Sequence, residues 1–160
     1  MGSLRDKYEK NFLLYDLIAS VIITGLIFLI AIRTPLNSKI LELLVGIRLS
    51  LYNTIISVAG ALIGFVITGL SILISMKETP SLELLKKSKY YKQIYDVYLS
   101  TSRCLGMLLF IALFAIILDH DNKPIPIMPY IILWGLMIST LRIARCLWVI
   151  KNIIGLITKK

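Results

Sequence analysis

The chain has 160 residues, 58% of them hydrophobic, and its mean hydropathy is +0.84. Soluble domains contain about 45–50% apolar residues, and here the excess lies in long runs, which argues against a soluble domain and for lipid as the solvent. Eighteen Lys and Arg oppose nine Asp and Glu. Because the basic residues flank the apolar runs, we expect anionic lipid headgroups, and not nucleic acid, as their partner.

The first apolar run predicts a membrane-spanning helix over about residues 12–32, since a span needs roughly 20 mostly apolar residues. Arg5, Lys7 and Lys10 precede this run, as basic residues would in a signal peptide. The run is longer than the apolar core of about 7–15 residues in a signal peptide, and no small-x-small cleavage site follows it. We therefore expect a retained helix.

A turn signal at Pro35 follows the first span, and the second span is predicted at about 53–76. The apolar pattern resumes before the second span begins, which leaves two interpretations open. Residues 40–76 form one long helix with Gly46 as its only weak point, or residues 40–51 form an interfacial helix that turns into the span.

The second span carries small and weakly polar residues at intervals of three or four positions, close to the helical repeat of about 3.6. These residues form a stripe on one face of the helix: Asn53, Ser57, Gly60, Gly64, Thr68, Ser71 and Ser75, with Gly46 and Ser50 extending it backwards. Such a stripe favours either close packing against another helix or a wet lining of a conduit. Because four helices enclose little space, a conduit would need several copies, each contributing its second span.

The segment between the second and third spans predicts a cytoplasmic amphipathic helix over about residues 80–97. Thr79 is a suitable N-cap and Pro80 a suitable first helical residue. Its candidate lipid or partner surface consists of Leu84, Tyr91, Tyr95, Tyr98, Lys89 and Lys92. We expect this surface to lie on anionic lipid, with docking of a cytosolic protein as the alternative.

The third and fourth spans are predicted at about 99–118 and 127–149. The loop between them groups Asp119, His120 and Asp121, whose side chains are of the types that bind divalent cations. Adjacent residues in an exposed loop rarely converge on one ion, so we expect no metal site there.

Four charged residues lie within the spans at similar depth, near the predicted cytoplasmic ends: Asp16, Arg103, Arg142 and Arg145. A charge in the membrane is costly unless it is paired. We therefore expect a structural ion pair between Asp16 and one of the three arginines. Arg103 and Arg145 have an alternative, because they are placed to extend their side chains to the headgroups.

The distribution of Lys and Arg predicts the orientation in the membrane. With four spans, fourteen of the eighteen lie on the side of the two termini, and short cytoplasmic segments are enriched in such residues. We therefore predict an all-α integral membrane protein with a single domain over residues 1–160. It has four transmembrane helices and both termini in the cytoplasm, and it lies in the plasma or inner membrane.

Catalytic and cofactor motifs are missing from the sequence. There is no Gly-rich phosphate loop, no H-E-x-x-H and no nucleophile elbow. Cys104 and Cys146 lie in separate apolar runs and form no C-x-x-C pair. We therefore expect neither enzymatic activity nor a cofactor.

Residues 60–75, GALIGFVITGLSILIS, resemble apolar segments of many small prokaryotic membrane proteins, some of them encoded beside antiviral systems. The resemblance implies a prokaryotic membrane protein and assigns no role to any residue. From the stripe we predict a homo-oligomeric membrane pore or ion channel lined by the second span. One alternative is a non-enzymatic, membrane-anchored effector or scaffold subunit that recruits a cytosolic partner through residues 79–98, with a prokaryotic defence system as one candidate setting. The other is a lytic, holin-like pore.

Overall fold

The computed structural model describes residues 4–75 and 89–158, and its elements are all helices. They are α1 (Leu4–Arg33), α2 (Leu36–Leu43), α3 (Arg48–Ser75), α5 (Lys89–Leu118) and α6 (Met128–Thr158). Four stretches are long and apolar enough to cross a membrane: Leu13–Arg33, Arg48–Ser75, Gln93–Leu118 and Met128–Ile153. The prediction of an all-helical chain with four membrane-length helices is therefore confirmed.

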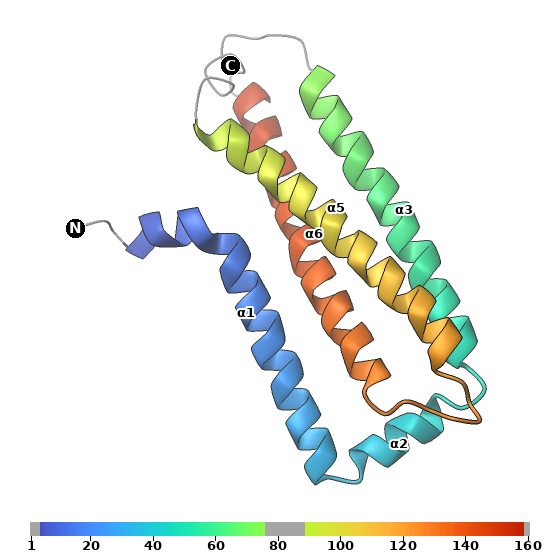
Figure 1. Cartoon of the computed structure of the whole chain (residues 1–160). Helices are drawn as coiled ribbons and strands as arrows, with labels where there is room; N and C mark the ends of the chain where they lie inside the picture. The colour runs from blue at the N-terminus through green and yellow to red at the C-terminus, as the bar shows by residue number, and fades with distance from the viewer. Residues whose placement is uncertain (1–3, 76–88, 159–160) are drawn as a thin grey trace.

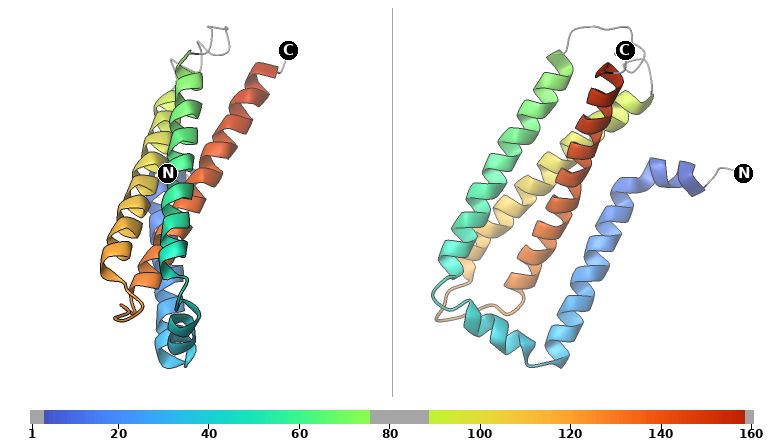
Figure 2. Two further views of the ribbon diagram at one scale, coloured as in Figure 1. Left: turned by 90° about the vertical axis from the view of Figure 1, so that its right-hand side faces the viewer. Right: turned by 180° about the vertical axis from the view of Figure 1, so that it is seen from behind.

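Contacts link the four long helices in the order α1, α6, α5, α3, which differs from their order in the chain. They stand side by side in this order at the lower end of Figure 1, and toward the upper end α5 crosses in front of α6. The helix pairs with extensive contact are α3 with α5, α5 with α6, and α6 with α1. Consequently α1 and α3 occupy the two edges of an open layer, as the view from behind in Figure 2 also shows. One copy of the chain thus forms a layer and not a closed ring of helices.

The short helix α2 lies at one end of the layer, between the ends of α1 and α3 (Figure 1). Gly46 separates α2 from α3 because its φ of +80° lies in the left-handed region, which a glycine adopts without the steric cost of a Cβ atom. Of the two interpretations for residues 40–76, the continuous helix is therefore wrong. A separate short helix precedes the span, and it ends earlier than the expected residue 51.

The predicted amphipathic helix over residues 80–97 is only partly described. Residues 89–97 form the first turns of α5, which continues without interruption into the third span. The continuity follows from the sequence, because neither Gly nor Pro occurs between Lys89 and Leu105. Residues 80–88 lie outside the described residues.

The buried side chains gather between α3, α5 and α6. One cluster includes Ile55, Ala59 and Ala112, and a second includes Val66 and Leu105. Small residues at these contacts let neighbouring backbones approach closely, which is how helices associate when lipid removes the hydrophobic force between them.

Much of the apolar surface faces away from the chain itself. Only 11% of the apolar window of α1 and 17% of that of α3 are buried within the structure. A soluble protein buries its large apolar side chains, and extended exposed apolar faces mark contact with membrane or partner proteins. Together with the helix lengths, this surface is what a membrane protein would present to lipid.

Candidate functional site

The stripe on α3 faces away from the rest of the chain. Each of its residues from Asn53 to Ser75 is exposed, whereas the buried residues of the helix include Tyr52, Ala59 and Val66. At about 100° per residue, the centre of the stripe lies roughly 160° around the helix from the centre of the buried set. Among the described residues, the stripe therefore makes no contact with another helix of the same copy.

The two glycines of the stripe confirm that its surface is open. A Cβ atom added at Gly60 or Gly64 would meet nothing within 4 Å, but one at Gly69 would lie 3.2 Å from the ring of Tyr98. Gly69 serves a contact inside the chain. Gly60 and Gly64 make no such contact with the described residues of the same copy, so a partner outside the chain has room to approach them.

The hydroxyl groups of the stripe bond to their own helix. Ser57 donates to the carbonyl oxygen of Asn53 at 2.9 Å, and Thr68 donates to that of Gly64 at 2.9 Å. Ser71 makes the equivalent bond one turn further on. These bonds satisfy the hydroxyl protons and leave oxygen lone pairs directed outwards.

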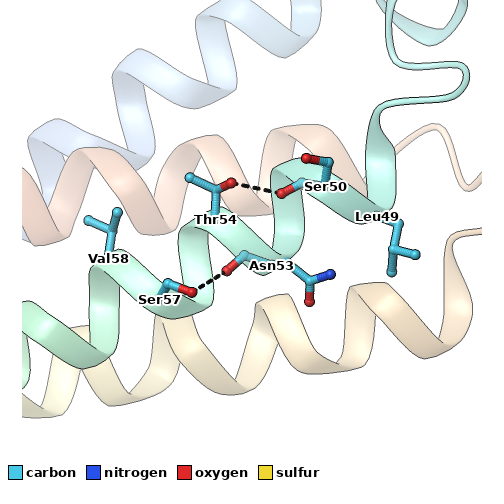
Figure 3. A pocket seen from close by; sticks show the side chains of 6 residues that line it. All are labelled: Leu49, Ser50, Asn53, Thr54, Ser57 and Val58. Atoms are coloured by element: carbon cyan, nitrogen blue, oxygen red, sulfur yellow. Dashed lines mark hydrogen bonds between the residues drawn. The ribbon is translucent and has the colours of Figure 1, made fainter.

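Asn53 is the strongest polar group on the stripe. Its amide is exposed and has no hydrogen-bond partner among the residues that the structure describes. It lines a shallow hollow of about 510 Å³ on the first turns of α3 (Figure 3). The hollow is lined by Leu49, Ser50, Asn53, Thr54, Ser57 and Val58. An amide so placed needs water or another chain to satisfy its two donors and its acceptor.

Large apolar residues border the stripe on both sides. Val58, Phe65 and Ile72 form one flank and are 50–56% exposed. Ile67 and Ile74 lie on the other flank and are 53% and 55% exposed. The outward half of α3 is therefore a small, weakly polar strip between two apolar borders.

A buried ionic cluster lies at the beginning of α3. Nη1 of Arg48 donates to both carboxylate oxygens of Asp119, at 2.8 and 2.9 Å. The hydroxyl of Tyr52 and the backbone N–H of Ile125 also donate to this carboxylate. Arg48 is 2% exposed and Asp119 is 4% exposed, so the pair is shielded from solvent and from lipid.

Asp121 completes this cluster from its rim. Its Oδ1 lies 3.1 Å from Nε of Arg48, and its Oδ2 accepts the N–H of Gly46 at 3.1 Å. In the sequence, Asp119, His120 and Asp121 stand out together, but in the structure both aspartates turn to Arg48 and His120 is exposed. Sequence reasoning missed this cluster because Arg48 and Asp119 are 71 positions apart.

The charges of the opposite end meet between α1 and α6. Nε and Nη2 of Arg145 both donate to the carboxylate of Asp16, the second at 2.6 Å. Arg142 lies 3.9 Å from the same carboxylate and donates to the carbonyl of Leu13 at 2.6 Å. Arg103, the third candidate, is exposed on α5 and is not part of this group.

Polar contacts continue from this group along the seam between α1 and α6. Trp134 donates its indole N–H to the hydroxyl of Ser20 at 3.2 Å. The ring of Tyr130 packs edge-on against Phe28 at 5.0 Å between centroids, and its hydroxyl donates to Asn37 at 3.2 Å. The edge helix α1 is thus attached largely by polar and aromatic groups.

The residues of the candidate lipid or partner surface lie in different environments. Tyr95 is exposed and Tyr91 is half-buried, whereas Tyr98 is 1% exposed and packs on α3. Tyr98 therefore belongs to the core. Leu84 lies outside the described residues, as do the side chains of Lys89 and Lys92.

Among the described residues, no three His, Cys, Asp or Glu side chains come together in a way that could hold a metal ion. The thiol of Cys146 is buried 3.2 Å from the hydroxyl of Thr101. Comparison of the chain with protein-family models, with curated proteins and with solved structures gives no match.

Proposed function

We propose that this chain assembles into a membrane pore in which the outward stripe of α3 lines the lumen. The observation that carries the proposal is the position of the stripe, which lies opposite the buried face of α3 and is open along the whole span. If the small residues of α3 served only packing within one copy, they would face inwards. Here the inward face is apolar, and the polar strip is directed to whatever lies outside the copy.

The borders of the stripe suit this arrangement. Large apolar flanks such as Phe65 and Ile67 can pack on neighbouring copies while the strip between them stays wet. The exposed amide of Asn53 favours water over hydrocarbon, because an unpaired amide in an apolar medium costs about 2–7 kcal/mol. The edge position of α3 in the open layer leaves space for another copy beside it.

Geometry sets a lower limit on the number of copies. In a ring of five helices with neighbours about 9 Å apart, each axis lies about 7.7 Å from the centre. Helices have a radius of about 5–6 Å with average side chains, so the lumen radius is about 2 Å and larger where glycine and serine face inwards. Four copies would leave only about 1 Å by the same reasoning. The pore therefore requires roughly five or more copies.

The proposed orientation places both termini in the cytoplasm of the cell that carries this protein in its plasma or inner membrane. Its support is the excess of Lys and Arg on the side of the termini, fourteen of eighteen. The same residues are proposed to contact anionic headgroups. The proposal includes no enzymatic step and no cofactor.

Flux through liposomes containing the purified protein tests this function. Thr68→Leu places an apolar side chain on the stripe and is expected to lower ion flux by roughly tenfold through dewetting of the lumen. Ile72→Leu, on the exposed flank one turn further along, is the matched control and should leave flux unchanged. Absence of flux from the wild-type protein at every voltage would contradict the pore, as would equal flux in the two variants.

A further inference from the structure

The side chains of α3 make polar contacts with other segments only at the first turns of the helix, within the part of the chain that the structure describes. Arg48 and Tyr52 reach Asp119, and Arg48 also donates to the carbonyl of Leu41 at 3.2 Å. The hydroxyls further along the helix, such as that of Thr68, bond within α3. One buried cluster thus joins α3 to α2 and to the segment that follows α5.

Most of the remaining contacts of α3 discriminate weakly between rotations of the helix about its axis, and the close fit of Gly69 against the ring of Tyr98 is the exception. Its buried face carries Ile55 and Val66, and its exposed flanks carry Val58 and Ile67, so both are apolar. In lipid there is no hydrophobic force that favours burying one of these faces over another. The ionic cluster does discriminate, because turning α3 would withdraw Arg48 from a buried carboxylate and leave both charges without their partner.

The connection before α3 permits such a rotation. Gly46, with its φ of +80°, interrupts the helical backbone two residues before Arg48, so α2 does not fix the rotation of α3. The N–H of this glycine is itself held by Asp121 at 3.1 Å. The break and the first turn of α3 are therefore held by neighbouring residues of one loop.

We propose that Arg48, Tyr52 and Asp119 form a latch that sets the rotation of α3 and thereby regulates the pore. While the latch is closed, the stripe is directed to the lumen; when it opens, α3 turns about the break at Gly46 and presents its apolar face. These three are positioning residues, which act through the orientation of α3. The regulatory part of this proposal rests on the pore function proposed above, whereas the control of rotation does not.

Spin-label distances measure the rotation without reference to flux. One label is attached to α3 through Ser57→Cys and the other to α5 through Phe114→Cys, both of which are exposed positions. The native cysteines are replaced by Cys104→Ala and Cys146→Ala. Labelled copies are diluted with unlabelled protein in liposomes, so that the measured distance lies within one copy.

Two variants of graded severity open the latch. Arg48→Gln removes the charge, and Tyr52→Phe removes only the hydroxyl and so keeps the packing needed for folding. Tyr130→Phe is the matched control, because its hydroxyl bonds to Asn37 elsewhere at the same end of the layer. We expect Arg48→Gln, and more weakly Tyr52→Phe, to broaden or shift the distance distribution and to lower flux by roughly fivefold or more. Tyr130→Phe should change neither.

The outcomes separate this inference from the pore itself. Unchanged distances in both latch variants overturn the latch, even if the wild-type protein conducts. Altered distances with unchanged flux also overturn its regulatory role. If the wild-type protein does not conduct, the pore fails, and the distances alone decide whether the cluster sets the rotation of α3. Should Arg48→Gln not fold, Tyr52→Phe carries the same two readouts.

Discussion

Asp119 and Asp121 lie two positions apart, but changing each to asparagine is expected to lower the free energy of unfolding by very different amounts. The carboxylate of Asp119 is fully buried and accepts hydrogen bonds from Arg48, Tyr52 and the N–H of Ile125. Asp119→Asn keeps the shape but removes the charge and turns an acceptor into an N–H₂ group facing donors. Breaking a buried pair on one side costs about 3–5 kcal/mol, and we expect the free energy of unfolding to fall by this amount.

Asp121→Asn is the internal control for this prediction. The side chain of Asp121 is 42% exposed, and its contacts to Nε of Arg48 and to the N–H of Gly46 both measure 3.1 Å. Exposed ion pairs contribute about 0–1 kcal/mol, so its loss should be correspondingly small. Unfolding by SDS in mixed micelles, followed by circular dichroism, gives both free energies. Equal losses below about 1 kcal/mol for the two variants would refute the assignment of Asp119 as a buried partner of Arg48.

Three further predictions follow from the same structure. Asp16→Asn leaves Arg142 and Arg145 without this carboxylate and should lower the free energy of unfolding in SDS by about 3–5 kcal/mol. Asp96→Asn, at an exposed site on α5, is the control and should lower it by under about 0.5 kcal/mol. Equal losses in the two variants would contradict the burial of Asp16. Gly64→Ala should leave the protomer as stable or more stable by up to about 1 kcal/mol, since nothing lies within 4 Å of its new Cβ, and should leave the oligomer intact on native electrophoresis because the methyl group faces the lumen; a weakened oligomer would show that Gly64 packs against a neighbouring copy instead. Trp134→Phe removes the bond to Ser20 and should cost about 0.5–1 kcal/mol; a cost of several kcal/mol would show that the indole contributes mainly through packing.

The helices were predictable because each depends on a local signal. A run of about 20 apolar residues has few structural solutions in lipid, so the number and approximate limits of the long helices follow from composition alone. The break before α3 does not follow from the sequence, since Gly46 tolerates a helix as well as the positive φ that it adopts. The structure decides it, with Asp121 fixing the N–H of that glycine.

The contacts between helices were harder to predict, because a local sequence pattern does not specify which helix faces pack together. The stripe of α3 follows from the helical repeat, but its direction away from the copy depends on where α5 packs. The partners of Asp16 could be narrowed to three arginines by depth, and packing of α1 on α6 brings together Asp16 and Arg145 while leaving Arg103 exposed. Tyr52 gave no signal, since a tyrosine near a helix end is expected at any membrane interface.

The proposed pore requires that water cover the outward stripe of α3 in the assembled protein. Single cysteines are introduced at residues 57, 64 and 68 on the stripe, and at 58, 65 and 72 on its flank, in a chain without native cysteines. Reactivity with a water-soluble thiol reagent in liposomes is then measured for each. We expect fast reaction at the three stripe positions and slow reaction at the three flank positions. Equal protection of all six from that reagent, with uniform labelling by a lipid-dissolved probe, would contradict it.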